Sequence, residues 1–433
     1  MLDIRFIREN KELIALGAKK KHIDFDVDAL IALDDKRREL LTAVEAKRAE
    51  QNAVSEKILA ASPSEKVTMI ADMKELKDSL QAQEDELKEI LKQWQLLMVS
   101  VPNIPDMSVP EGKDDTDNME LRTWGDTPKF PFEPKSHIDL MLAHDMVDFD
   151  RGTKVAGFRG YFLKNDGVKL QFALWNFVQD FFAKKGATAS PEEKRVNSWT
   201  PMVVPSLVRR EPFMGTGYLP QSEEDLYKTQ DGEYLSGTAE VATMAYYMDE
   251  VLDKSQLPIK MLAFSPAFRR EAGSHGKDTK GLIRVHEFYK LEQVVLCEAS
   301  HAESVKYHEE VTTNAEEIMQ ALGIPYRIVV NCGGDLGLGQ VKKYDIEAWV
   351  PAEKKYRETH SASYFHDFQT RRLNIRYKDE DGKMKFVHSL NNTALSGRPM
   401  IALIENFQQE DGSIKIPDVL VPYMGGQTII KKN

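Results

Sequence analysis

The sequence predicts an α+β fold: an N-terminal antiparallel two-helix coiled-coil arm, then a larger domain built on an antiparallel β-sheet flanked by helices. Long stretches of the first hundred residues lack glycine and proline, which predicts long helices. Strand-like runs in the remainder cluster without regular βαβ alternation, which favours an antiparallel sheet. At roughly 150 residues per domain, a chain of 433 residues is expected to hold two or three domains.

The arm is expected over about residues 28–99, where neither glycine nor proline interrupts the chain on either side of Pro63. Two long helices would therefore flank the turn Ser62-Pro63-Ser64, with Ser64 capping the second helix. Heptad spacing supports a coiled coil in which the seam of the first helix is more polar than the seam of the second. The second helix has Met73, Leu80, Leu87 and Trp94 with Leu76, Gln83, Ile90 and Leu97, and the first has Leu30, Arg37, Val44, Gln51 and Ile58 with Leu33, Leu40, Lys47 and Val54.

Two interpretations of the arm stay open at this stage. It is a solvated coiled coil that joins subunits, with polar layers fixing its register, or it projects to contact a long partner. Acidic residues outnumber basic ones along it, and periodicity does not choose between the two. The cations available for a partner are Arg37, Arg38, Lys47, Arg48 and Lys57.

Composition divides the rest of the chain. Residues 1–105 form the N-terminal domain, residues 106–136 form a connector rich in Pro, Asp and Gly, and residues 137–433 form one domain of mixed elements. Helices are expected at 168–185 and 300–322. Strands are expected at 202–208, 261–268, 288–297, 326–332, 344–351 and 400–407.

The amino-acid composition and net charge argue against several classes of protein. Charged residues make up 29% of the chain, and no apolar run approaches the roughly 18 residues of a membrane span. The net charge of −11 argues against a uniformly basic nucleic-acid binder but allows a local basic face. Without a secretory signal, and with only Cys297 and Cys332, the chain is expected in the reducing cytoplasm.

Two patterns carry no specific chemistry. The glycine-rich GGDLGLGQ at 333–340 fits neither the dinucleotide fingerprint nor the P-loop, so we interpret it as a turn. The histidines at 301, 308, 360 and 366 lack the spacing and thiolate partners of a zinc site, so solvated or core histidines are expected.

The segment from Phe264 to Val295 is more informative, because two apolar runs flank a glycine-containing loop rich in cations. Arginines suit a polyphosphate by bidentate contact, and an aromatic face suits a purine. The alternative is a salt-bridged surface hairpin. The loop cations are Arg269, Arg270, Lys277, Lys280 and Arg284, and an antiparallel hairpin would place Arg269, Glu271, Arg284, Phe288 and Glu292 over one surface.

FRREAG, the loop and Arg284-x-x-x-Phe288 resemble motif 2 of the class II aminoacyl-tRNA synthetases. Nearly the whole chain resembles one family of that class, the seryl-tRNA synthetases, in the order and spacing of its motifs. The matching segments are VPSLVRREPFMGTGYLP at 204–220 (motif 1 and its continuation), GTAE at 237–240, YDIEAWVPAEKKYRETHSAS at 344–363, DFQTRR at 367–372 and HSLNNTALSGRPMIALIENFQ at 388–408 (motif 3).

The resemblance implies a class II catalytic domain at 137–433 and an N-terminal tRNA-binding domain. The implied ligase activates L-serine with ATP and Mg²⁺ to seryl-adenylate, then transfers the seryl group to the 3′ end of tRNA(Ser). It also implies a homodimer, with Pro205 of motif 1 at its interface, and binding of tRNA(Ser) by the arm. Whether tRNA(Sec) is a second substrate stays open.

Residue by residue, the resemblance assigns the ATP site. Arg269 would contact the α-phosphate and the serine carboxylate, and Arg284 the γ-phosphate. Glu271 would read the adenine amino group, while Phe288 and Arg398 would cover the two faces of the base. Glu358 and Ser361 would hold Mg²⁺. The full set is Arg269, Arg270, Glu271, Arg284, Phe288, Glu358, Thr359, His360, Ser361 and Arg398, with Arg269, Arg284 and Glu358 as its catalytic members.

The same resemblance assigns the serine site to Thr238, Ala239, Glu240, Arg269, Glu292, Asn391 and Thr393. Three departures from the family pattern affect neighbouring contacts. FRREAG has Arg270 where the family has serine, residues 359–363 read THSAS, and motif 3 reads Asn391-Asn392-Thr393-Ala394 where NGSG is usual. Thr393 keeps a hydroxyl that could contact the serine hydroxyl.

Two other functions are alternatives to this one. A class II paralogue could load the activated amino acid onto another acceptor such as a carrier protein, but such relatives typically lack a long helical arm. A coiled-coil interaction protein with a dead catalytic domain would require loss of Arg269, Arg284 or Glu358, and all three are present.

Overall fold

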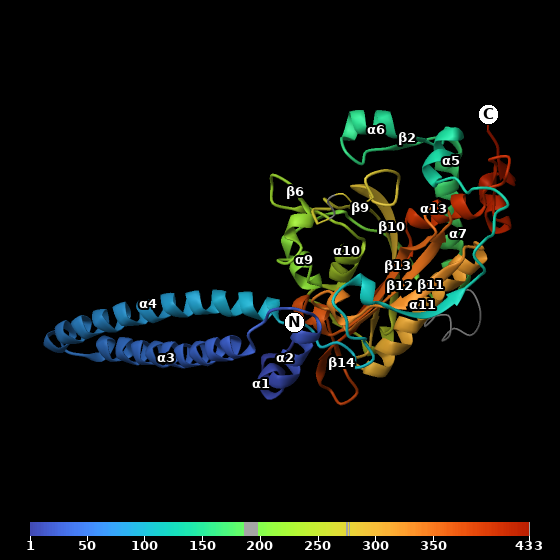
Figure 1. Ribbon diagram of the computed structural model, residues 1–433. Helices are drawn as coiled ribbons and strands as arrows, with labels where there is room; N and C mark the ends of the chain where they lie inside the picture. Colours follow the sequence, from blue (N-terminus) through green and yellow to red (C-terminus); the bar gives the residue numbers. More distant parts are fainter. Residues whose placement is uncertain (186–197, 274–275, 277, 433) are drawn as a thin grey trace. The chain divides into compact units, whose positions relative to one another are not determined.

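The computed structural model describes residues 1–185, 198–273, 276 and 278–432 (Figure 1). Lys277, one of the expected loop cations, lies outside these residues. The chain divides into two compact units. The first holds Met1–Lys19 and Ile23–Pro102, and the second holds Lys20–His22 and Asn103–Asn433.

The first unit is helical, with α1 (Ile4–Glu9), α2 (Lys11–Lys20), α3 (Val27–Ala60) and α4 (Pro63–Ser100). The Asp26 carboxylate caps α3 by accepting from the backbone N–H of Ala29 at 2.9 Å. Helix α4 begins two residues earlier than the sequence suggested. Ser62, not Ser64, is its N-cap, because Pro63 suits the first helical position and the Glu65 carboxylate accepts from the Ser62 backbone N–H at 3.0 Å.

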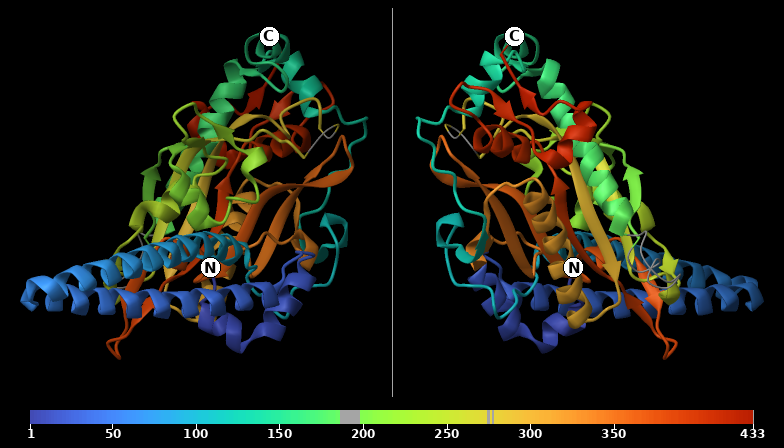
Figure 2. Two further views of the ribbon diagram at one scale, coloured as in Figure 1. Left: turned by 90° about the vertical axis from the view of Figure 1, so that its left-hand side faces the viewer. Right: turned by 90° about the vertical axis from the view of Figure 1, so that its right-hand side faces the viewer.

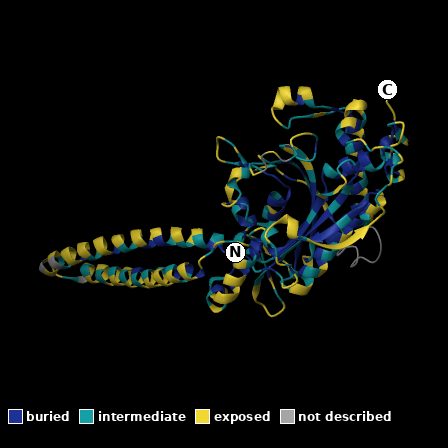
Figure 3. Cartoon of the chain, in the orientation of Figure 1, coloured by how far each residue is buried: buried dark blue, intermediate teal, exposed yellow. Residues whose placement is uncertain are grey.

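The antiparallel pair α3–α4 confirms the coiled-coil arm and its seam. Val44, Leu80 and Leu87 form a buried cluster, and the remaining faces are exposed along most of the arm (Figure 3). The Arg37 side chain, a polar layer of the seam, has its partners within the arm. Its guanidinium donates to the Asp34 carboxylate at 2.8 Å and lies 4.7 Å from the centre of the Trp94 ring.

The second unit is built on an eight-stranded sheet in the order β1-β11-β12-β13-β16-β10-β9-β4. Every neighbouring pair is antiparallel except β4–β9, so the expected antiparallel sheet is confirmed. Its strands are β1 (Met119–Trp124), β4 (Thr200–Val203), β9 (Ile259–Phe268), β10 (Glu287–Cys297), β11 (Tyr326–Val330), β12 (Lys342–Val350), β13 (Lys355–His366) and β16 (His388–Leu395).

Helices cover one face of this sheet, and the right-hand view of Figure 2 shows α7 in green and α11 in orange against it. Helix α11 is tied to the sheet by Asn392, whose side-chain amide donates to the Val311 carbonyl at 2.7 Å. The main core lies between helices and sheet, and includes Trp175, Val311, Ile346 and Leu403. The helices of this unit are α5 (His137–Ala143), α6 (Phe149–Ala156), α7 (Asn165–Lys185), α9 (Arg210–Thr216), α10 (Glu240–Met244), α11 (His301–Ala321), α12 (Phe368–Arg372) and α13 (Arg398–Asn406).

Smaller sheets lie at the edges of the unit. They pair β2 (Val147–Asp148) with β3 (Phe162–Leu163), β5 (Leu207–Val208) and β6 (Tyr227–Lys228) with β7 (Tyr234–Leu235), β8 (Val251–Leu252) and β15 (Met384–Phe386) with β14 (Arg376–Lys378), and β17 (Ile414–Lys415) with β18 (Ile429–Ile430).

Most expected elements form, and three segments differ from expectation. Residues 400–406 of the apolar run lie in helix α13 and not in a strand. Short apolar runs do not distinguish a strand from a helix buried on most sides, and Pro399 suits the first turn of this helix. The expected strand 202–208 divides between β4 and β5, which belong to different sheets. Within the segment expected as a connector, Met119–Trp124 forms edge strand β1.

In the ranges that the structure describes, no helix is both long enough and apolar enough to cross a membrane.

Candidate functional site

Most residues assigned to the ATP and serine sites lie on the sheet face opposite α11. Side chains alternate along a strand, so Phe288, Lys290 and Glu292 of β10 share one face. Glu292 is paired with Thr393 of β16, and Asn391 lies two residues before Thr393. Gln293 of β10 points the other way, where its side-chain amide donates to the Val311 carbonyl of α11 at 3.1 Å.

A β-bulge brings Glu358 and Ser361 to this same face. In the β12–β13 register Glu347 pairs with Glu358 and Asp345 pairs with Ser361, and the extra residue between them is Thr359. Without the bulge, two residues three apart would point to opposite faces. The bulge therefore groups two expected metal ligands beside Asp345.

The structure does not bring the side chains of Thr359 and His360 into this group. The Thr359 hydroxyl donates to the backbone carbonyl of Ile346 at 3.0 Å, so it is used within the sheet. His360 is 1% exposed, and burial lowers the pKa of its imidazole to about 4. Their assignment to ATP binding stays a prediction that side-chain placement does not support.

Arg398 connects Glu358 to the segment that follows the motif 2 loop. Its guanidinium pairs with the Glu358 carboxylate at 3.0 Å and donates to the Ile283 carbonyl at 3.2 Å. Desolvation opposes ionisation of Glu358, but the charges of Arg398, Lys343 and Arg269 outweigh it and lower the pKa of the carboxyl below its ordinary value. Glu358 is therefore an anion at neutral pH.

The β9–β10 hairpin forms as expected and positions the two motif 2 arginines. Arg269 follows β9 directly, and its guanidinium carbon lies 5.3 Å from the centre of the Phe288 ring. Arg284 pairs with the Glu271 carboxylate and lies 3.5 Å from Asp278. Glu271 and Arg284, expected to contact opposite ends of ATP, neutralise each other in this structure.

Arg270 lies apart from this cluster. Its side chain is exposed, while its backbone N–H donates to the Asp225 carbonyl at 2.9 Å. The serine found at this position in the family is therefore replaced by a surface cation, and the exposed side chain does not support the expected part of Arg270 in ATP binding.

The assigned serine pocket holds two buried carboxylates. The Glu240 carboxylate accepts from the Gln369 side-chain amide at 2.7 Å and from the Tyr218 hydroxyl at 3.0 Å. Burial and the nearby charge of Glu292 raise the pKa of Glu240 to about 7. Glu292 is 1% exposed and pairs with Lys290 at 2.7 Å.

The remaining pocket residues surround these carboxylates. The Thr238 hydroxyl accepts from the Glu240 backbone N–H at 3.3 Å and from the Lys290 ammonium at 3.4 Å. Ala239 is buried against Val204 and Ala263. Asn391 and Thr393 are 5% and 3% exposed, so both side chains are enclosed.

Pro205 lies between β4 and β5 and is exposed. Its neighbours Val203 and Leu207 are 83% and 52% exposed. This segment is therefore an apolar surface at the edge of the sheet.

Comparison with known proteins decides the family. The seryl-tRNA synthetase N-terminal domain matches residues 1–105, and the tRNA synthetase class II core domain (G, H, P, S and T) matches residues 226–407. Serine--tRNA ligase of Deinococcus radiodurans is 43% identical over 99% of both chains. The chain belongs to the seryl-tRNA synthetases.

Solved seryl-tRNA synthetases share its fold over the full length. The enzyme from Pyrococcus horikoshii, complexed with ATP, has a TM-score of 0.88 and 37% identity, covering 100% of each chain. The cytoplasmic serine-tRNA ligase from Naegleria fowleri, complexed with AMP, has a TM-score of 0.85 and 32% identity, covering 100% of this chain and 99% of that one. The resemblance read from the motifs is therefore confirmed at the family level.

The groups expected to bind Mg²⁺ in this seryl-tRNA synthetase fit the ion's preference for oxygen ligands. Glu358 supplies a carboxylate and Ser361 a hydroxyl. Asp345 lies beside them with a buried oxygen, Oδ1, that has no hydrogen-bond partner among the described residues. Among those residues, no three His, Cys, Asp or Glu side chains are grouped as a metal site, so substrate or water oxygens would have to complete the coordination.

Sequence reasoning missed four polar residues of this face: Lys290, Asp345, Tyr218 and Gln369. Strand alternation could have predicted the first two. Lys290 lies midway between Phe288 and Glu292 on one strand, and Asp345 lies in an alternating strand pattern. Tyr218 and Gln369 reach Glu240 from segments 22 and 129 residues away along the chain. No local pattern predicts that contact.

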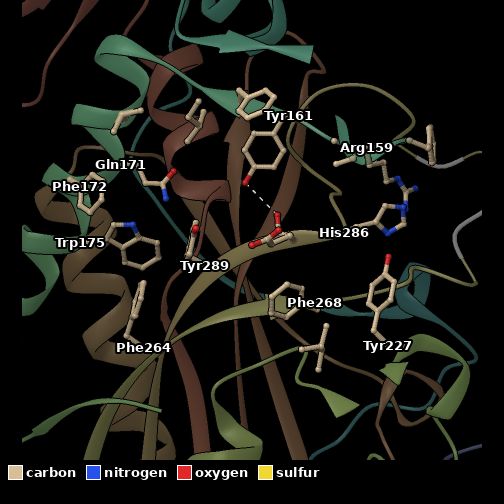
Figure 4. A pocket seen from close by; sticks show the side chains of 18 residues that line it. Arg159, Tyr161, Gln171, Phe172, Trp175, Tyr227, Phe264, Phe268, His286 and Tyr289 are labelled. Atoms are coloured by element: carbon tan, nitrogen blue, oxygen red, sulfur yellow. Dashed lines mark hydrogen bonds between the residues drawn. The ribbon is translucent and has the colours of Figure 1, made fainter. Parts of the chain in front are cut away.

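A large cavity of about 720 Å³ lies on the opposite face of the β9–β10 hairpin (Figure 4). Its walls are aromatic, with Trp175 and Phe264 in edge contact at 5.5 Å and Phe264 stacked on Tyr289 at 5.9 Å. It contains none of the residues assigned to ATP, serine or Mg²⁺. The assigned chemistry therefore belongs to the polar face and not to this cavity.

Proposed function

We propose that this chain is an ATP-dependent ligase that activates L-serine as seryl-adenylate and transfers the seryl group to tRNA(Ser). One observation carries the proposal: a single face of the sheet presents Arg269 over Phe288 next to the buried pair Glu292 and Thr393. The first pair suits a nucleotide phosphate and base, and the second suits a small hydroxylated amino acid. The ATP and AMP held by two relatives support the nucleotide part.

The first step joins the serine carboxylate to the α-phosphorus of ATP and releases pyrophosphate. Such a transfer needs positioning and stabilisation of negative charge rather than a covalent protein nucleophile. We assign Arg269 to the α-phosphate and the serine carboxylate, and Arg284 to the γ-phosphate. The second step is attack by a ribose hydroxyl of the tRNA 3′ end on the seryl carbonyl, with AMP as the leaving group.

ATP would rearrange two ion pairs of the structure. The γ-phosphate competes with Glu271 for Arg284, and the Glu271 carboxylate then accepts from the adenine amino group. Both partners of the original pair thus keep a charge-assisted contact, which limits the cost of separating them. Arg398 likewise has to leave Glu358 before it can cover the base.

Glu358 and Ser361 would hold Mg²⁺, with Asp345 adjacent. When bound, the ion would neutralise phosphate charge. The low pKa of Glu358 keeps this carboxylate ionised and available at neutral pH.

Serine recognition rests on a buried hydrogen bond. A pocket that bonds the serine hydroxyl rejects alanine because its own polar groups would be left unpaired. We assign this contact to Glu292 and Thr393, and contacts to the amino group to Thr238 and Glu240. Asn391 forms the adjoining wall.

We propose that residues 1–105 bind tRNA(Ser) through the α3–α4 arm, residues 106–136 connect, and residues 137–433 catalyse. Exposed cations on α3, including Arg38 and Lys57, would contact the phosphate backbone, which needs only a cationic face on an acidic chain.

We also propose a cytoplasmic homodimer with Pro205 at its interface. The exposed apolar segment around Val203 supports the dimer. Two buried free cysteines fit a reducing compartment.

Amino-acid-dependent exchange of labelled pyrophosphate into ATP tests the proposed function. We expect exchange with serine, and at least 100-fold lower kcat/KM for Arg269→Lys, because lysine keeps the charge but loses the bidentate fork. Arg270→Lys, the exposed neighbour, is the matched control and should keep wild-type activity. Exchange with an amino acid other than serine, or none with any of the twenty, would refute the proposal.

A further inference from the structure

A buried histidine holds the segment that leads from the motif 2 loop back to β10. His137, the first residue of α5, is 3% exposed and lies outside the motif segments. Its ring Nε2 accepts from the backbone N–H of Leu282 at 3.4 Å. Leu282 lies two residues before Arg284, so His137 contacts the main chain that carries the arginine assigned to the γ-phosphate.

The glycine at position 281 permits this close approach. Gly281 has a φ of +81°, and a Cβ added to it would lie 2.5 Å from Nε2 of His137 and 3.0 Å from the Ile138 side chain. A larger residue would therefore push the main chain away from the first turn of α5. The backbone before Arg284 is thus fitted to this helix.

A buried carboxylate orients the His137 ring. Glu405 of α13 is 1% exposed, and its Oε1 accepts from the His137 backbone N–H at 2.7 Å and from ring Nδ1 at 2.8 Å. Its Oε2 accepts from the Ala352 backbone N–H at 3.0 Å. Because Nδ1 carries the proton donated to Glu405, Nε2 of the neutral ring is unprotonated and can accept from Leu282. Glu405 therefore fixes both the orientation and the tautomer of the ring.

Helix α13 supports the segment before Arg284 from both of its ends. At its start, Arg398 donates to the Ile283 carbonyl at 3.2 Å. Near its end, Glu405 acts through His137. ATP binding as proposed would move Arg398 onto the adenine, whereas no assigned role requires His137 to move. His137 can therefore hold the segment while Arg284 changes partners.

We propose that His137, oriented by Glu405, is a positioning residue that places Arg284 for the γ-phosphate of ATP. The inference rests on the proposed function and adds a residue to the support of its ATP site. An arginine that is already held in place loses less conformational freedom when it binds phosphate. Loss of the bond from Leu282 should therefore weaken ATP binding and leave serine binding unchanged.

Two replacements of His137 separate its two side-chain contacts. Asparagine can place its amide nitrogen near the position of Nδ1 and keep Glu405 bonded, but it has no acceptor within reach of Leu282. Glutamine can place its carbonyl near the position of Nε2 and accept from Leu282, but it lacks the donor at Nδ1. In serine-dependent pyrophosphate exchange, His137→Asn should raise the KM for ATP at least threefold with the KM for serine within twofold of wild type. His137→Gln should raise the KM for ATP less than threefold.

The controls distinguish positioning from a general loss of stability. His144→Asn is the matched variant, because His144 is also buried, ends the same helix and bonds to the Gly412 carbonyl at 2.7 Å. It should lower the unfolding temperature and raise the KM for ATP less than threefold. A non-hydrolysable analogue of seryl-adenylate, which has no β- or γ-phosphate, should inhibit wild type and His137→Asn with inhibition constants within twofold of each other.

Gly281→Ala gives a second test if His137→Asn fails to fold. It should displace the main chain from His137 and raise the KM for ATP at least threefold. Gly276→Ala is its control, because Gly276 also has a positive φ, +79°, and a Cβ added there has no described atom within 4 Å. A rise below threefold in folded His137→Asn or Gly281→Ala, or an equal rise in His137→Gln or His144→Asn, would overturn the inference.

Absence of serine-dependent exchange in the wild type would instead refute the proposed function. Equilibrium dialysis with labelled ATP would then decide the positioning separately. Weaker ATP binding by His137→Asn than by wild type would support it, and equal binding, or none by wild type, would overturn it.

Discussion

At the scale of single residues, the chemistry depends on how buried charges are compensated. Glu240 and Glu292 are both buried in the assigned serine pocket, and the charge of Glu292 raises the pKa of Glu240 further. Lys290 pairs with Glu292, whereas the hydrogen bonds that the Glu240 side chain accepts among the described residues come from the neutral groups of Tyr218 and Gln369. An incoming serine ammonium would supply the missing positive charge, so the pocket is complementary to that group.

Thr393→Val tests the hydroxyl contact directly. Valine keeps the volume but cannot hydrogen-bond, so we expect a higher KM for serine and a serine-to-alanine preference reduced about tenfold or more. The KM for ATP should change little. Thr312→Val on α11, a buried threonine bonded to its own helix at His308, is the matched control. A serine-to-alanine ratio unchanged by Thr393→Val would leave specificity to Glu292 and Thr238.

Glu240 predicts a defined pH dependence of stability. The pKa of Glu240 is raised in the folded protein from 4.5 to about 7. Protonated Glu240 therefore increases the free energy of unfolding below pH 4.5, and this stabilisation is lost as the pH rises through about 7. The difference between the two pKa values corresponds to about 3 kcal/mol in the free energy of unfolding. The free energy of unfolding of Glu240→Gln, relative to wild type, should therefore rise between pH 4.5 and 7 and then level off.

Exposed Glu224→Gln is the control, and its difference from wild type should stay flat over the same range. If the difference in free energy of unfolding between Glu240→Gln and wild type is also independent of pH, the Glu240 carboxyl has an ordinary pKa in the folded protein.

At the scale of elements, the site depends on strand register. The bulge at Thr359 places Glu358 and Ser361 on one face, and the β10–β16 register places Thr393 opposite Glu292. Seven-residue spacing predicted the arm, and apolar runs predicted β9, β10, β11 and β12. The motifs supplied the family. The strands β13 and β16 were not read as strands, since their polar site residues interrupt the apolar pattern.

The bulge, the helix at 398–406 and the contacts of Tyr218 and Gln369 with Glu240 could not be read locally. Each depends on tertiary packing: a short apolar run forms a helix or a strand according to its neighbours, and register is set between strands. The alternative of a salt-bridged hairpin allows ion pairs in this segment, but no sequence pattern identifies Glu271 and Arg284 as the partners.

Shortening the arm should separate the two activities. Removing residues 49–78 and joining the helices by a Gly-Ser turn keeps Val44, Leu80 and the Arg48–Glu84 ion pair. We expect serine-dependent pyrophosphate exchange within about twofold of wild type and at least 100-fold slower charging of tRNA(Ser). Equal loss of both activities in a folded variant would refute this division of labour.

At the scale of the whole molecule, one edge of the sheet lacks a covering element among the described residues. β4 is the terminal strand, and Val203 is 83% exposed. An uncovered edge strand with apolar side chains is a site for association. The proposed homodimer would bury it, with the two copies related by a two-fold axis.

Val203→Asp should therefore dissociate the dimer. Light scattering at micromolar concentration is expected to give twice the chain mass of 49.3 kDa for wild type and the monomer mass for the variant. Val67→Asp on the arm, also an exposed valine, is the control and should remain dimeric. A wild-type monomer would contradict the proposed interface.

The most direct test of the central claim is attachment of labelled serine to tRNA by the purified full-length chain. We predict ATP-dependent, acid-precipitable seryl-tRNA(Ser) with wild type and with Arg270→Lys, and at least 100-fold less with Arg269→Lys. Serine-dependent pyrophosphate exchange without any charging of tRNA, together with loading of a carrier protein, would contradict the account.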